Sequence, residues 1–565
     1  MPNVYLLLAV CRKVCGFDSR QPAISSHSRF GNTAFAQVRS GAARRLLALL
    51  RMAEFSLGAG QDICISPIIS TQSDLNRVSD GKNSRHVVIL YGFNKRMMEK
   101  VGREKGLRHE KAEGKMKVCK FGGSSVASAE QVTKIVEIVL ADPERRIVVV
   151  SAPGKRDKAD TKVTDLLITC ADQALADKEY EDTLAAIVER YAAIQRELKL
   201  PVGITAEIEK DLRFRLAGDK SHRGIFMDCM KAAGEDNSAK IVAQAFQARG
   251  LKAVYLDPRE AGMYLTSDYG NAQLLEESYQ FLPTTLRGRD EIVIFPGFFG
   301  YTKDGKVATF PRGGSDITGS ILAAAVKADV YENFTDVDSV YPVDPRLVPN
   351  VKAGIPMMTY REMRELSYAG FGVFHDEAVI PAVKAGVPIN VRNTNRPQEP
   401  GTLIVQSRRV LAGGVVGIAS DDGFCNIFVD KYMMNREIGF GRHLLQILEW
   451  EGVSYEHMPS GIDNVSVVIR DKNFSPECER RVIERIKRDL NPDAVLVERG
   501  YALVMVVGEG LYYTVGMAAK ATRALSDAGV NIEMMNQGSS EISMMFGVKA
   551  EQRAKAVQAL YNAFF

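Results

Sequence analysis

Residues 117–125, KVCKFGGSS, join a short strand pattern to a turn of glycine and serine, and a helix pattern begins at about Ala129. Residues 146–151, RIVVVS, and 291–295, EIVIF, repeat the strand pattern as continuous apolar runs. Such runs are typical of strands that are buried on both faces of a sheet. Their alternation with helix patterns predicts a mainly parallel sheet covered by helices on both faces, an α/β fold. We expect this domain to cover residues 116–405.

The pattern changes after this domain. Residues 414–420 (GVVGIAS) and 465–469 (VSVVI) are strand-like and enclose a helix pattern, and a similar succession recurs from residue 502 onward. This repetition predicts two βαββαβ modules of ferredoxin-like topology. We expect them at residues 414–490 and 495–565.

Residues 1–115 differ from the rest in charge and in periodicity. They carry 19 Lys and Arg and nine Asp and Glu, a net charge of +10, whereas the remainder of the chain has a net charge of −6. Because Arg, Ser and Gly are scattered there and periodicity is poor, we expect a basic, disordered extension. Two interpretations stay open: a natural extension, and upstream sequence that precedes a natural start at Met116, directly before the first strand.

The composition excludes several classes of protein. Hydrophobic residues make up 46% and charged residues 25%, as in ordinary globular proteins. No apolar run reaches the length of a membrane span, and the acidic remainder offers no basic footprint for nucleic acid. The eight cysteines form no CxxC pair and no zinc-type cluster with histidine, so we expect free thiols, a cytoplasmic location and no metal site built by the protein itself.

The first chemical signature is the phrase KFGGSS at residues 120–125. Glycines without Cβ atoms let the backbone amides approach a phosphate closely, and the following helix start favours anions. Lys120 can place a positive charge on a phosphoryl group in transfer. In a P-loop the lysine follows the glycines, whereas here it precedes them. Taken alone, the phrase is equally typical of a tight turn with a solvated lysine.

Three further phrases carry groups suited to a small charged substrate. Arg312, in PRGGSD, offers a planar guanidinium that can pair with a carboxylate through two hydrogen bonds. Glu235 follows Gly234 and could bind an ammonium group, although a glutamate in a first helical turn usually only complements the helix dipole. Residues 335–346 follow a strand, where α/β sheets bind ligands, and Tyr341 and Arg346 could contact adenine and phosphate.

In this order the motifs resemble the amino-acid kinase family, and within it the aspartokinases. The resemblance spans residues 117–546. It rests on the phrases KFGGSS at 120–125, KVTDLL at 162–167, GE at 234–235, RGGSD at 312–316, TDVDSVYPVDPR at 335–346 and NIEMMNQGSSEISMMF at 531–546.

The resemblance implies a three-layer αβα sandwich followed by two ACT modules, which bind amino-acid effectors and build a homodimer. It implies ATP-dependent phosphorylation of the side-chain carboxylate of L-aspartate, the first step toward lysine, threonine and methionine, with Mg²⁺ carried by the nucleotide. Catalytic roles fall on Lys120, which stabilises the transferring phosphoryl group, and on Asp316, which orients Lys120 or the metal-bound nucleotide. Implied substrate contacts are Thr164, Glu235, Arg312 and Ser315, and implied ATP contacts are Lys120, Gly122, Gly123, Ser124, Thr335, Asp336, Tyr341 and Arg346.

This reaction needs no general base, because the nucleophilic carboxylate has an ordinary pKa of about 3.9 and is already ionised near neutral pH. Catalysis would instead rest on positioning and on charge neutralisation by Lys120 and Mg²⁺.

The chain departs from the family pattern at two points, and several alternative functions remain. Many relatives carry a lysine where this chain has Gly372, in the phrase GFGVFH. The family pattern also does not require residues 1–115, called the leader below. The alternatives are a kinase for glutamate, carbamate or UMP, a kinase fused to homoserine dehydrogenase, and a catalytically inactive sensor that keeps the ACT modules. The effector, lysine or threonine, would bind where residues 434–441 face residues 459–465, and the sequence does not choose between the two.

Overall fold

The computed structural model describes residues 115–371, 376–512, 514–538 and 542–565. The expectations for the leader and for Gly372 therefore lie outside the described residues. The chain divides into two units, residues 1–108 and 109–565, and every described residue belongs to the second unit.

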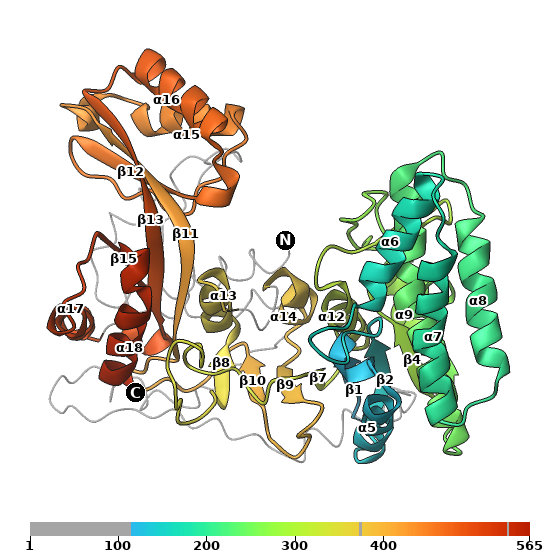
Figure 1. The fold of residues 1–565 in the computed structure, drawn as a ribbon. Coiled ribbons are helices and arrows are strands. Elements are labelled where there is room, and N and C mark those ends of the chain that lie inside the picture. The colour runs from blue at the N-terminus through green and yellow to red at the C-terminus, as the bar shows by residue number, and fades with distance from the viewer. Residues whose placement is uncertain (1–114, 372–375, 513, 539–541) are drawn as a thin grey trace, which may run out of the picture. The chain divides into compact units, whose positions relative to one another are not determined.

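An eight-stranded sheet forms the centre of the first part of the described chain, with the order β3-β4-β2-β1-β7-β9-β10-β8 (Figure 1). Neighbouring strands pair in parallel except β9 and β10, which confirms the expected mainly parallel sheet. The strands are β1 (Lys117–Phe121), β2 (Arg145–Val150), β3 (Ala253–Tyr255), β4 (Ile292–Pro296), β7 (Val330–Thr335), β8 (Met357–Thr359), β9 (Ile389–Asn393) and β10 (Thr402–Val405); a separate hairpin joins β5 (Phe299–Tyr301) and β6 (Val307–Thr309).

Helices cover both faces of this sheet because its strands are apolar on both sides. Cys119 and Phe121 face one hydrophobic core with α5 to α9, whereas Val118 faces the other core with α10 to α14. Figure 1 shows α6 to α9 stacked as one layer beside the sheet. The helices are α5 (Ala129–Leu140), α6 (Val163–Leu175), α7 (Glu181–Glu197), α8 (Gly203–Leu216), α9 (Arg223–Ala248), α10 (Pro258–Ala261), α11 (Ser278–Leu286), α12 (Gly314–Val326), α13 (Tyr360–Tyr368) and α14 (Ile380–Lys384).

The second part of the described chain is built on one antiparallel sheet of five strands, in the order β12-β11-β13-β15-β14. Its two central strands, β11 and β13, are 14 residues long and run side by side through the whole sheet (Figure 1). The elements are β11 (Gly417–Asp430), α15 (Phe440–Trp450), β12 (Asn464–Arg470), α16 (Pro476–Leu490), β13 (Ala494–Val507), α17 (Met517–Asp527), β14 (Met534–Asn536), β15 (Ser543–Lys549) and α18 (Arg553–Phe564).

The helices divide this sheet into two halves. The first half packs α15 and α16 on β12 and on residues 424–430 of β11. The second half packs α17 and α18 on β15 and on residues 501–507 of β13. Each central strand thus belongs to both halves, so the two do not follow one another along the chain as the boundaries 414–490 and 495–565 would require.

Helix α13 connects the two sheets through buried hydrogen bonds. Glu362 is fully buried, closes a capping box with Thr359, and accepts the Glu509 backbone N–H at 3.0 Å. Arg408 pairs with the same carboxylate at 2.7 Å, and Thr359 donates to the Glu509 side chain at 2.9 Å. The Arg408 guanidinium and the two backbone N–H groups hold the pKa of Glu362 below its ordinary value, against the effect of burial. The carboxylate is therefore a charged link between the two sheets.

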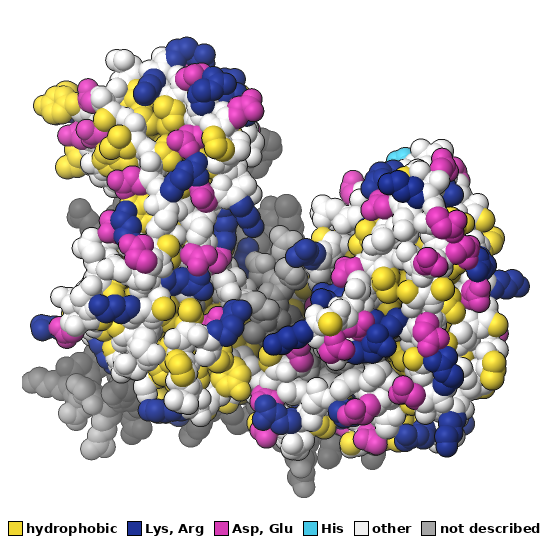
Figure 2. All heavy atoms as spheres, viewed as in Figure 1, with side chains coloured by type: hydrophobic (Ala, Val, Ile, Leu, Met, Phe, Trp, Pro, Cys, Tyr) yellow, Lys and Arg dark blue, Asp and Glu magenta, His cyan; other side chains and the backbone are white. Residues whose placement is uncertain are grey.

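Figure 2 shows basic and acidic side chains interspersed across the described part of the face in view. Among the described helices, none combines the length and the apolar character that crossing a membrane requires.

Candidate active site

A cavity of about 670 Å³ opens at the carboxyl ends of β1 and β2, where a parallel sheet of this class binds ligands. It brings together side chains from β1, α6, α9 and the start of α12, which are far apart in the sequence. The predicted site residues that line it are Lys120, Gly123, Thr164, Glu235, Arg312, Ser315 and Asp316.

Lys120 lies on β1 with its ammonium group held by one carboxylate. Its Nζ lies 2.7 Å from Oδ1 of Asp316, and the lysine side chain is only 9% exposed. The same Oδ1 accepts a hydrogen bond of 2.6 Å from Nδ2 of Asn333, which pairs with Lys120 across β1 and β7. Asp316 is thus fixed from two sides and holds the lysine in place. Asn333 was not among the predicted site residues, because one polar residue in a strand pattern carries no distinct signal.

The glycine loop after β1 packs backbone against backbone. The Gly122 N–H donates to the Phe334 carbonyl at 3.2 Å, and the Gly154 N–H donates to the Gly123 carbonyl at 2.8 Å. A Cβ on Gly123 would lie 3.0 Å from the Ala152 carbonyl oxygen, closer than nearly all such contacts. Gly123 lines the cavity, whereas Ser124 is exposed beside it. The loop therefore presents backbone groups at the cavity edge without intervening side chains.

Glu235 lies in the middle of α9, and its Oε2 is buried without a hydrogen-bond partner among the described residues. A Cβ on Gly234 would lie 2.7 Å from Cβ of Ala152, so glycine allows α9 to approach the end of β2. Burial raises the pKa of Glu235 to about 8, although hydrogen bonds from Ala152 and Ser315 and the charge of Lys120 oppose the shift. An unpartnered acceptor beside a cavity is suited to a cationic ligand group such as an ammonium.

Arg312 and Gly313 form the turn that starts α12. Gly313 has a φ of +77°, a left-handed conformation that favours glycine, and Asp316 lies in the first helical turn. Within the described residues Arg312 is exposed to the cavity and forms no ion pair. Its guanidinium is therefore available to a ligand carboxylate.

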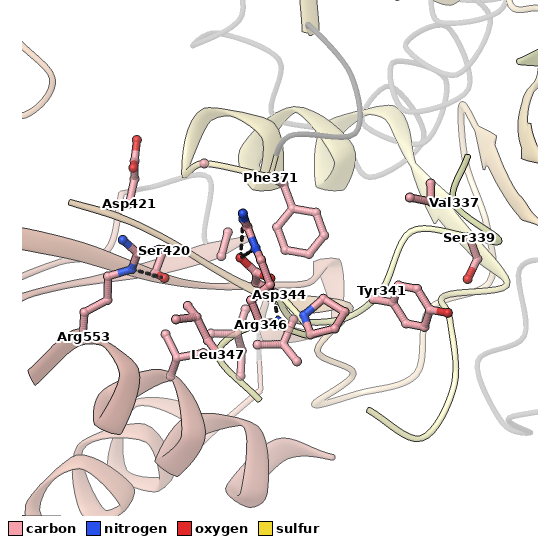
Figure 3. A pocket seen from close by; sticks show the side chains of 16 residues that line it. Val337, Ser339, Tyr341, Asp344, Arg346, Leu347, Phe371, Ser420, Asp421 and Arg553 are labelled. Atoms are coloured by element: carbon pink, nitrogen blue, oxygen red, sulfur yellow. Dashed lines mark hydrogen bonds and ion pairs between the residues drawn. The ribbon is translucent and has the colours of Figure 1, made fainter. Parts of the chain in front are cut away.

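Tyr341 and Arg346 line a different cavity, of about 390 Å³, between the segment after β7 and the second half of the five-stranded antiparallel sheet. Figure 3 shows Arg346 turned toward Asp344, with which it forms an ion pair at 2.7 Å, while Tyr341 points away from this pair. Arg553 of α18 lies on the opposite side and donates to Ser420 at 3.1 Å (Figure 3). The structure does not bring these two expected ATP contacts into the cavity of Lys120.

Thr335 and Asp336 lie at the end of β7, next to the glycine loop, and line neither cavity. The Thr335 hydroxyl donates to the Asp336 carboxylate at 3.2 Å. The expected nucleotide contacts thus extend from the glycine loop past β7 to the second cavity, and their role stays a prediction.

Comparisons with known proteins agree with this architecture. Residues 115–393 match the amino acid kinase family, and residues 504–564 match an ACT domain. The chain is 58% identical to aspartokinase 3 of Bacillus subtilis over 450 residues, which cover 80% of this chain and 99% of that protein.

Solved structures give the same relationship. Clostridium acetobutylicum aspartate kinase superposes with a TM-score of 0.71 at 38% identity, covering 80% of this chain and all of that one. Escherichia coli aspartokinase III in complex with aspartate and ADP gives a TM-score of 0.65 at 25% identity, and its complex with lysine and aspartate gives 0.64 at 26%. These two comparisons cover 80% of this chain and 100% and 99% of those chains. The glycine loop, the buried glutamate and the two-sheet architecture thus occur in a chain that belongs to the aspartokinase family.

Proposed function

We propose that this chain transfers the γ-phosphoryl group of ATP to the side-chain carboxylate of L-aspartate, which gives 4-phospho-L-aspartate. The observation that carries the proposal is the cavity in which the Lys120–Asp316 pair, the unpartnered carboxylate of Glu235 and the guanidinium of Arg312 lie together. A cavity with these groups suits a substrate that has carboxylates and an ammonium, together with a phosphoryl donor. The E. coli relative binds aspartate and ADP, which supports this assignment.

In the proposed reaction an oxygen of the substrate's side-chain carboxylate forms a bond to the γ-phosphorus, and the bond from that phosphorus to the ADP oxygen breaks. Lys120 stabilises the negative charge on the transferring group, and Asp316 keeps Lys120 in position. Glu235 binds the substrate ammonium, and Arg312 binds its α-carboxylate with help from Thr164 and Ser315.

The nucleotide would lie along the glycine loop and the end of β7. Gly122, Gly123 and Ser124 would contact its phosphates, and Thr335, Asp336, Tyr341 and Arg346 would hold the remainder. Mg²⁺ would arrive with ATP and neutralise phosphate charge. Among the described residues no three acidic, cysteine or histidine side chains form a metal-binding group. Both side-chain contacts of Asp316 described above use Oδ1, so its other carboxylate oxygen suits the hydration shell of such an ion.

The second sheet would regulate this activity. We expect an amino-acid effector to bind the first half near residues 434–441 and 459–465, and lysine is favoured because the E. coli relative binds it. Threonine stays the alternative effector. We also propose that the regulatory sheets of two chains pair as a homodimer in the cytoplasm, with residues 116–405 as the catalytic domain.

Trapping of the acyl phosphate with hydroxylamine tests the proposed activity. Wild-type protein with ATP, Mg²⁺ and L-aspartate should give aspartyl hydroxamate, and Lys120→Met should give almost none. Lys303→Met is the matched control, because that lysine is 64% exposed in its side chain and pairs with Glu277. A wild-type chain that binds aspartate or lysine but forms no hydroxamate would favour the inactive amino-acid sensor.

A further inference from the structure

Lys231 is a cation in the active-site cavity that none of the motifs singles out. It lies on α9 four residues before Glu235, and both residues line the cavity. Four residues are about one helical turn, so the two side chains project from the same face of α9, separated by about 6 Å along its axis. The chain thus presents a lysine and an unpartnered glutamate next to one another in one cavity.

The ammonium group of Lys231 is held at a fixed point. Its Nζ lies 2.6 Å from Oδ1 of Asp228 and donates to the Thr309 hydroxyl at 3.2 Å. The other oxygen of Asp228 accepts the backbone N–H groups of Gly270 at 2.7 Å and Thr309 at 2.8 Å. An ammonium has three donors and these two partners use two, so the third N–H is left for a ligand or for the ring of Phe298, whose centroid lies 5.9 Å away.

The neighbourhood of Lys231 suits the zwitterionic end of an amino acid. In an amino acid the ammonium and the α-carboxylate are bonded to the same carbon, so their binding groups must lie close together. Glu235 and Lys231 offer this pair of opposite charges on adjacent turns. Lys120 pairs with Asp316 beside the glycine loop and would face the reacting carboxylate, although its charge also acts on Glu235.

We propose that Lys231 binds the α-carboxylate of the substrate, beside Arg312, and so sets the preference for an α-amino acid. This inference rests on the proposed function, because it assigns a further contact to the same substrate. Asp228 is the positioning residue that aims Lys231. The competing interpretation is that Lys231 only neutralises Asp228 and holds the loop around Gly270.

Binding of three related ligands to Lys231→Met distinguishes these roles. L-Aspartate has both carboxylates, L-asparagine keeps only the α-carboxylate, and 3-aminopropanoate keeps only the side-chain carboxylate. Loss of one charge-assisted hydrogen bond should reduce the affinity for L-aspartate and for L-asparagine by roughly ten- to hundredfold. The affinity for 3-aminopropanoate and the KM for ATP should change less than about twofold, since neither ligand offers an α-carboxylate. Lys231→Arg, which keeps the charge, should restore part of the affinity.

Lys240→Met is the matched control, because Lys240 lies on the same helix and pairs with Asp236 at 3.0 Å outside the cavity. The inference is overturned if Lys231→Met reduces the affinity for all three ligands by the same factor, or if the affinity for L-aspartate does not change. Hydroxamate formation by the wild-type enzyme separates the two proposals. If it is absent the proposed function fails, and if it is present while the ligand pattern is wrong only the role of Lys231 fails.

Discussion

Replacement of Glu235 by glutamine tests whether substrate binding is linked to release of a proton. Burial raises the pKa of Glu235 from an ordinary 4.5 to about 8, so without a cationic partner this carboxyl is mostly protonated at neutral pH. An ammonium ligand needs the ionised form. With a pKa of about 8, about a tenth of the molecules are ready to bind at pH 7, and the apparent affinity is reduced by that fraction.

The ionised fraction of Glu235 also determines how strongly the affinity for L-aspartate should depend on pH. The apparent dissociation constant for L-aspartate should fall by roughly fifteenfold between pH 6.5 and pH 8, and binding at pH 7 should release about 0.9 proton. Titration calorimetry without ATP measures both, if the binding heat is compared in two buffers of different ionisation enthalpy. Glu235→Gln should bind more weakly and should show almost no proton release or pH dependence.

Stability gives an independent check of this reasoning. Because the pKa of Glu235 is raised in the folded protein, the native state holds a proton that the unfolded chain has lost above about pH 4.5. The associated stability is present at lower pH and disappears as pH rises through about 8, and Glu235→Gln should not show this loss. A flat pH profile of aspartate affinity in the wild type, or an unchanged slope in Glu235→Gln, would refute the argument.

Four other perturbations have defined outcomes. Asp316→Asn should lower kcat on the order of 10²-fold with little change in the KM for aspartate, measured by hydroxamate formation, because Lys120 loses its partner. Glu362→Gln should lower the free energy of unfolding in urea by about 2–4 kcal/mol, because Arg408 loses its countercharge. This difference from wild type should shrink at acidic pH, as the pH falls to the lowered pKa of Glu362 and its carboxylate is protonated. Arg346→Ala should raise the KM for ATP and leave that for aspartate unchanged. A chain that starts at Met116 should keep kinase activity, and its inactivity would assign a role to the leader.

The parallel sheet and the chemistry of its edge were predictable because each depends on local patterns. Lys120 precedes a glycine loop that follows an apolar strand, and Arg312 precedes a second glycine turn. Their meeting in one cavity depends on contact between β1 and the start of α12, which are distant in the sequence. Before the structure, only the family resemblance predicted that Lys120 and Arg312 share one site.

Asn333 and Lys231 were not predictable, because a single polar residue in an apolar strand or helix has many ordinary explanations. Their importance comes from contacts with Asp316 and Asp228, which only the folded chain brings near.

The sequence did not predict that β11 and β13 are continuous strands through the whole regulatory sheet. In β11 the triplet Asp421-Asp422-Gly423 interrupts the apolar run, a pattern typical of a turn between two strands. In the structure the strand continues through this point with shifted register, and Gly423 has a φ of +77°. Gly500 has a φ of +80° on the facing strand, so the irregularity occupies both strands at one level. A pattern that detects short strands therefore missed one continuous pair.

This shared pair of strands limits how the enzyme can be dissected or recombined. A fragment that ends at residue 490 would keep β11 but lose β13, and residues 417–422 would lack the partner with which they now pair. The exposed edge of β11 would have unpaired backbone N–H and C=O groups, which favour aggregation with other chains. Exchange of effector response with a relative therefore requires transfer of residues 417–565 as one piece, since neither half can be cut out with its strands complete.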